Sequence, residues 1–214
     1  MSARGLPPAE ELLRLFSVPM LLSWLDVEAP VLPAAAAAVL RERETRPGLQ
    51  RSNVGAWHGP PDLCQRDDAA LAAVFRSALR AVEFLQVSLC ATDTGGVPPA
   101  WKYRLQAWGV IMEAGDYAAV HDHAEAHWSF VCYLDEGDAD RRDHPRSGII
   151  AWTNPTAPPV QIPGLDPSPR VFELSPRSGQ VVVFPGWLPH YVHPYRGRRA
   201  RISIAGNVRV ELAS

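Results

Sequence analysis

Three histidines lie within seven residues of one another, at His121, His123 and His127, and a fourth, His190, follows a run of valines. His121 and His123 are two residues apart, so on a β-strand both rings point to the same face and can reach one ion. Neutral imidazole is a good ligand for iron, zinc, copper or nickel. Because such a pair also occurs at solvated strand ends, a metal site needs a further ligand from elsewhere in the chain.

His190 is the expected third ligand. It follows the apolar segment 180–184 and then Pro185, a pattern typical of a buried strand that ends at the mouth of a barrel. The sequence therefore predicts a metal centre formed by His121, His123 and His190.

The other nearby candidates are weaker. A turn-like segment separates His127 from the histidine pair, and on a regular strand His193 points away from the face that carries His190. Glu125 stays open as a carboxylate ligand or as a partner of one. Asp122 is expected at the surface.

A possible anion site follows in the alternating segment that begins at Arg201. Arg201 and Ser203 share one face of a predicted strand, while Ile202 and Ile204 pack on the other. We expect a hairpin with the strand of His190, which would place Arg201 deeper than the metal. A buried guanidinium needs an anion, and a small-molecule carboxylate with help from the Ser203 hydroxyl fits that need. The alternative is a solvated arginine, as expected for the three arginines just before it.

These residues are expected on a mainly β fold. The chain has 21 prolines and 15 glycines, and from Tyr103 onward short apolar runs alternate with turn residues. Eight such runs predict a double-stranded β-helix, also called a jelly roll, of the cupin-like kind. The expected strands span residues 105–112, 118–123, 128–134, 148–152, 170–174, 180–184, 190–193 and 200–210.

The first hundred residues favour helices packed on that core. Helical patterns cover residues 9–16, 33–41 and 69–87, the last with Asp67 or Asp68 as its cap, and a strand is expected within 17–28. We expect one domain over residues 1–214, with an N-terminal helical layer and flanking strands at 1–100 and the β core at 101–210.

Composition restricts the partners and the location. The net charge of −2 favours neither nucleic acid nor an anionic membrane. The cysteines, Cys64, Cys90 and Cys132, form no close pair, which is typical of a reducing compartment. With neither a signal peptide nor a membrane span expected, the sequence predicts a cytoplasmic protein. Since edge strands of such barrels often pair, a homodimer is a further possibility.

Four ordered motifs resemble one family, the 2-oxoglutarate and Fe(II)-dependent oxygenases of bacteria and phages. The motifs are Ser52-Asn53-Val54-Gly55-Ala56-Trp57, His121-x-His123 with Trp128-Ser129-x-x-x-Tyr133-Leu134, Phe184-Pro185-x-Trp187-Leu188-x-His190, and Arg201-Ile202-Ser203-Ile204-x-x-Asn207. The resemblance implies Fe(II) held by His121, His123 and His190, and 2-oxoglutarate as cosubstrate with its distal carboxylate on Arg201 and Ser203. It also implies dioxygen and a small-molecule substrate, which the sequence does not identify.

The chain departs from the family pattern at two places. His123 stands where the wider superfamily has Asp or Glu, so three neutral ligands would leave the ion with its full 2+ charge. The segment around Asn154 stands where the family usually has Asp-Pro-Arg, so a substrate or loop contact can differ there. Asn154, Trp108, Tyr133 and Trp187 are candidate pocket residues, although barrel aromatics also serve as plain core.

Two other functions are compatible with the same pattern. The glycine, histidine and proline spacings also resemble cupins, in which a three-histidine iron centre oxidises a thiol or diketone without 2-oxoglutarate. Arg201 would then hold the carboxylate of the substrate itself. The third reading is a metal-binding or small-acid-binding protein without catalysis.

Overall fold

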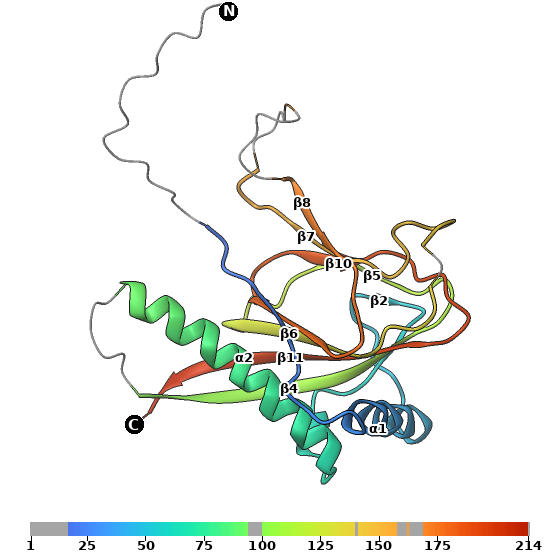
Figure 1. Ribbon diagram of the computed structural model, residues 1–214, viewed down its shortest axis with the longest axis horizontal. Helices are drawn as coiled ribbons and strands as arrows, with labels where there is room; N and C mark the ends of the chain where they lie inside the picture. The colour runs from blue at the N-terminus through green and yellow to red at the C-terminus, as the bar shows by residue number, and fades with distance from the viewer. Residues whose placement is uncertain (1–16, 94–99, 140, 158–161, 163–168, 214) are drawn as a thin grey trace, which may run out of the picture.

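A computed structural model shows two β-sheets that face each other, with two helices on the outside of one of them (Figure 1). It describes residues 17–93, 100–139, 141–157, 162 and 169–213. The larger sheet has the strand order β1 (Leu21–Trp24), β9 (Gln180–Pro185), β6 (Trp128–Asp135), β11 (Arg201–Leu212), β4 (Trp101–Met112) and β3 (Trp57–His58). The smaller sheet has the order β2 (Asn53–Val54), β5 (Tyr117–His121), β10 (His190–Val192), β7 (Ile150–Thr153) and β8 (Val171–Leu174).

Neighbouring strands run antiparallel, and the strands from β4 to β11 alternate between the two sheets except for β7 and β8, which pair with each other. This arrangement is the double-stranded β-helix, so the predicted fold class is confirmed. All eight expected strands are present, with ends that differ by a few residues. The segment 1–100 also supplies β1, β2 and β3, and the single-domain organisation stays a prediction.

The helices α1 (Val31–Thr45) and α2 (Ala69–Asp93) cover the outer face of the larger sheet (Figure 1). Both were expected, and both are longer than the apolar patterns predicted. Asp68 caps α2, because its carboxylate accepts hydrogen bonds from the backbone N–H groups of Ala70 and Leu71, each at 3.0 Å. Neither helix is long and apolar enough to cross a membrane. The helix expected at residues 9–16 lies outside the described residues.

The covering helices explain why β11 is buried on both faces. Ile202 and Ile204 pack in the core cluster that includes residues of α1 and α2. Arg201, Ser203 and Ala205 point the other way and line a cavity between the sheets. The alternation seen in the sequence therefore separates a helix-packed face from a cavity face, and neither face of this strand segment is solvated.

The predicted hairpin between the strands of His190 and Arg201 is wrong. β10 pairs with β5 and β7, whereas β11 pairs with β4 and β6. The residues between them cross from one sheet to the other, held by the fully buried Tyr195. Its hydroxyl donates to the Arg199 carbonyl at 2.6 Å and accepts the Asp138 backbone N–H at 3.0 Å. Tyr195 therefore fixes this basic link from inside the protein, which the sequence pattern does not reveal.

Candidate metal centre and cavity

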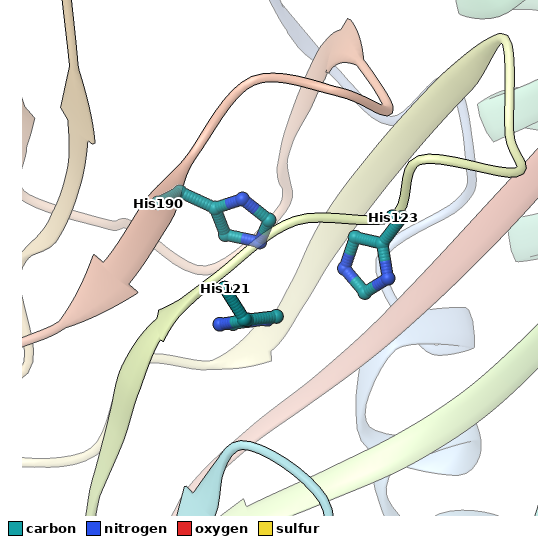
Figure 2. A group of neighbouring side chains, drawn as sticks. All are labelled: His121, His123 and His190. Carbon is teal, nitrogen blue, oxygen red and sulfur yellow. The ribbon is translucent and has the colours of Figure 1, made fainter.

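Three imidazole rings meet at the open end of the barrel (Figure 2). His121 ends β5 and lies opposite His190, which begins β10. His123 belongs to the turn after β5, and its backbone N–H donates to the Gly186 carbonyl at 2.7 Å. The ring centroid of His121 lies 4.3 Å from that of His190 and 5.1 Å from that of His123. One potential ligand nitrogen from each residue lies within 4.8 Å of the others, so a single ion can bind all three.

Main-chain carbonyls orient two of these rings. Nδ1 of His121 lies 2.7 Å from the Ala119 carbonyl, and Nδ1 of His190 lies 2.9 Å from the Leu188 carbonyl. A carbonyl only accepts hydrogen bonds, so each Nδ1 carries the proton and each Nε2 keeps its lone pair for a metal. This is the usual arrangement of metal-binding histidines.

Burial keeps the three rings neutral. Desolvation, followed by the charge of neighbouring histidines, lowers the pKa of His190 to about 3 and that of His123 to about 4. Desolvation also lowers the pKa of His121. Because a metal binds only unprotonated imidazole, these shifts keep the site competent well below neutral pH.

The weaker candidates have other contacts. Nδ1 of His127 accepts the backbone N–H of Val210 at 3.1 Å, and Nε2 of His193 lies 3.1 Å from a carboxylate oxygen of Glu173. Glu125 forms an ion pair with an arginine of β11. None of the three belongs to the histidine cluster found among the described residues.

A cavity of about 560 Å³ extends from the histidines into the barrel, and Arg201 lies on its wall. Only 2 % of Arg201 is exposed. Its Nη1 lies 3.1 Å from the sulfur of Met112, and its guanidinium lies over the Tyr133 ring, 5.1 Å from the centroid. Within the described part of the chain, no carboxylate forms an ion pair with it, and its Nε has no hydrogen-bond partner. This cation therefore lacks the anion that burial demands.

Tyr133 adds a second unmatched donor beside Arg201. It is fully buried, and its hydroxyl has no hydrogen-bond partner among the described residues. Desolvation raises its pKa to about 12, so the hydroxyl keeps its proton. Tyr133 is not among the residues that line the cavity, whereas Ser203, which pairs with it across β6 and β11, lines the cavity and has a buried hydroxyl. The Arg201 guanidinium and the Tyr133 hydroxyl, together with the Ser203 hydroxyl beside them, are donors suited to one carboxylate. 2-Oxoglutarate carries a carboxylate at each end.

The remaining candidate pocket residues lie in different environments. Trp108 lines the cavity, stacks on His58 at 5.2 Å and 17°, and lies 5.7 Å from the ring of His123. Trp187 is 48 % exposed in the turn after β9 and is not among the residues that line the cavity. The Asn154 amide likewise lies outside the lining and donates to the main chain near the start of β8.

Sequence reasoning missed His58 as a wall of this cavity. No role was assigned to this residue, which lies in β3 beside Trp108. Its one signal in the sequence is its place directly after the motif that ends at Trp57.

Comparison with known families agrees with this geometry. Residues 106–207 match the family described as "Putative 2OG-Fe(II) oxygenase". The barrel is a 2-oxoglutarate and Fe(II)-dependent oxygenase domain. The matched segment contains all three histidines, Arg201 and Ser203. No curated protein sequence matches the chain significantly.

Solved structures show the same fold for this oxygenase. A prolyl-4-hydroxylase of Pseudomonas putida has 19 % identity and a TM-score of 0.56, over 89 % of this chain and 91 % of that one. The epimerase SnoN of nogalamycin biosynthesis has 13 % identity and a TM-score of 0.60, over 91 % and 79 %. HygX of Streptomyces hygroscopicus, solved with nickel and 2-oxoglutarate bound, has 12 % identity and a TM-score of 0.57, over 90 % and 83 %.

Proposed function

We propose that His121, His123 and His190 hold the Fe(II) of this oxygenase and that Arg201 holds its 2-oxoglutarate. The observation that carries the proposal is the pairing of an all-imidazole cluster with a buried cation that lacks an anion, on the wall of one cavity. Bound iron with 2-oxoglutarate and dioxygen supplies the oxidation, in which one oxygen atom enters the substrate and the other enters succinate as CO2 leaves.

The residues of the chain then have distinct roles. The three neutral imidazoles bind the ion through nitrogen atoms and leave its remaining positions free. Arg201 binds the distal carboxylate of the cosubstrate, and the hydroxyls of Tyr133 and Ser203 donate to the same group. Their buried position excludes water from the charged end of the cosubstrate and so strengthens these contacts. Together they orient the keto acid toward the histidines.

The substrate is proposed to bind in the part of the cavity that 2-oxoglutarate does not fill. Trp108 and His58 form an aromatic wall beside His123, toward the open end of the cavity. Arg51 and Asp122 line the cavity as well and supply polar groups. We infer a small-molecule substrate that lies against this wall and places one C–H bond next to the metal. Trp187 and Asn154 are proposed to contact it only at the rim.

Anaerobic titration tests the proposal. Fe(II) and 2-oxoglutarate added together to the metal-free protein are expected to give a metal-to-ligand charge-transfer band in the visible, and the Arg201→Met variant is expected to need far more 2-oxoglutarate for the same band. An iron-loaded protein without that band would refute the proposal. Oxygen uptake with cysteine or a similar acid, independent of 2-oxoglutarate, would instead support the three-histidine cupin chemistry.

The finer expectations about partners and location are part of the same proposal. We infer that the protein acts in the cytoplasm on a small molecule and not on nucleic acid, because its net charge is near zero and its three cysteines form no close pair in the sequence. A homodimer is proposed through β1, which is an outer strand of the larger sheet in the described part of the chain. Sedimentation would test the oligomeric state.

A further inference from the structure

His123 differs from the other two histidines in what its second ring nitrogen faces. His121 and His190 each have a main-chain carbonyl at Nδ1, whereas Nδ1 of His123 lies 3.5 Å from the side-chain nitrogen of Asn207. The Asn207 amide is in turn held by Ser129, whose hydroxyl donates to its oxygen at 2.9 Å. A side-chain network therefore replaces the carbonyl at this one ligand.

The contact between the Asn207 side-chain nitrogen and Nδ1 of His123 suits a His123 ring that binds no metal. An amide N–H that donates to Nδ1 of His123 leaves the single ring proton on Nε2. A metal on Nε2 requires the opposite tautomer, in which Nδ1 carries the proton and must find an acceptor. Without a change at Asn207, the N–H of the ring would then face the N–H of the amide.

A half-turn of the Asn207 amide removes that conflict. Its oxygen and nitrogen are alike in size, so turning the group places the oxygen at Nδ1 of His123 and the nitrogen at Ser129. Ser129 is only 2 % exposed, and its hydroxyl can accept as well as donate, so it fits both orientations. Asn207 and Ser129 lie directly opposite each other on paired strands, which keeps the two side chains in reach.

We propose that Asn207, oriented by Ser129, is the positioning residue for the third metal ligand and accepts the Nδ1 proton of His123 when the metal is bound. This inference rests on the proposed three-histidine centre. It gives His123, which lies in a turn and has no carbonyl of the described residues at Nδ1, the orientation that carbonyls give the other two histidines. Loss of such a partner typically lowers metal affinity by about 10- to 100-fold.

The test compares Asn207→Leu, Asn207→Asp and Ser129→Ala with wild type, all loaded with Co(II) without iron or substrate. Gln106→Leu is the matched control, because Gln106 lies opposite Asn207 on β4 and lines the same cavity without a bond to a histidine of the cluster. Two quantities are measured: Co(II) affinity by competition with a chromophoric chelator, and the paramagnetically shifted, exchangeable imidazole N–H signals by NMR.

Wild type and the Gln106→Leu control are expected to show three such signals, one for each Nδ1 proton. Asn207→Leu is expected to keep two slowly exchanging signals, lose the third to rapid exchange, and bind Co(II) about 10- to 100-fold more weakly. Asn207→Asp, whose carboxylate also accepts, is expected to keep all three signals and bind at least as tightly as wild type. Ser129→Ala is expected to lie between wild type and Asn207→Leu.

Two results overturn the inference: three slowly exchanging signals with wild-type affinity in Asn207→Leu, or weaker binding in Asn207→Asp than in wild type. Should Asn207→Leu fail to fold, the Asn207→Asp and Ser129→Ala measurements decide in the same way. A third such result would be two signals in wild type, because the Nδ1 proton of His123 would then lack its acceptor. Fewer than two signals, or no binding of Co(II) at all, would refute the three-histidine centre itself, a result that no Asn207 variant is needed to detect.

Discussion

Replacing Arg201 with methionine is predicted to stabilise the protein without cosubstrate and to impair the protein with it. Arg201 has 2 % of its surface exposed, and its guanidinium contacts a methionine sulfur and the face of Tyr133. An unmatched buried polar group costs about 1–3 kcal/mol, which an apolar side chain of similar length does not incur. The free energy of unfolding of the cosubstrate-free variant should therefore rise by about that amount, and each kcal/mol raises Tm by about 2–4 °C in a chain of this size.

The same substitution should have the opposite effect on 2-oxoglutarate. Loss of one partner of a buried charge pair costs about 2–4 kcal/mol of binding free energy, or roughly 30- to 1,000-fold in affinity. Thermal unfolding with and without 2-oxoglutarate, in the presence of a redox-inert metal, measures both effects in one experiment. The cosubstrate should raise the Tm of wild type clearly and that of the variant hardly at all.

Arg199→Met is the control for this prediction. Arg199 is close in the sequence, but 63 % of its side chain is exposed, so its replacement should change neither the stability nor the cosubstrate response by much. If Arg201→Met bound 2-oxoglutarate within about threefold of wild type, Arg201 would not be the carboxylate site, and the reasoning from its missing anion would fail.

Three further predictions concern the metal and the crossover between the sheets. His190→Gln should lower Co(II) affinity by at least about 100-fold, measured by chelator competition, and near-wild-type affinity would refute its role as a ligand. Tyr195→Phe should lower the free energy of unfolding by about 1–3 kcal/mol in urea, because the Arg199 carbonyl and Asp138 N–H lose their buried partner; an unchanged midpoint would contradict this. Hydrogen bonds from the backbone N–H groups of Arg199 and Arg198 hold the pKa of Asp138 below its ordinary value, so its contribution is full above about pH 4 and is lost as the pH falls further. The free energy of unfolding of Asp138→Asn should therefore fall less on acidification than that of wild type. Equal slopes of this free energy against pH in the two proteins would contradict the prediction.

The part of the site that could be predicted from the sequence is the part set by local alternation. Residues two apart on a strand share a face whatever the strand pairs with, so Arg201 and Ser203 could be grouped without knowing the topology. The same rule grouped His121 with His123, although β5 ends at His121 and His123 lies in the turn that follows. The helical stripes that became α1 and α2 are local in the same sense. The long-range partner His190 was found only because a buried strand followed by proline has a recognisable composition.

The part that could not be predicted depends on pairing across the chain. The link from β10 to β11 was expected to be a hairpin because it is short and basic, but the strand pairing shows that it joins the two sheets, with Tyr195 buried beneath it. His58 faces the cavity because β3 adds to the edge of the larger sheet, which its two residues do not reveal. Asn207 meets His123 across 84 positions of sequence, so no local pattern connects them.

The charges of the site explain why its parts belong together. In the proposed site, three neutral imidazoles would leave a bound Fe(II) with two uncompensated positive charges, and Arg201 adds a third within the same cavity. Two carboxylates of one cosubstrate would offset most of this charge at two places at once, the metal and the guanidinium. Metal and cosubstrate should therefore each bind more tightly when the other is present, by the same factor, because linkage between two sites is reciprocal. A site with an acidic third ligand would need this coupling less, so His123 ties the metal more closely to the cosubstrate than an aspartate would.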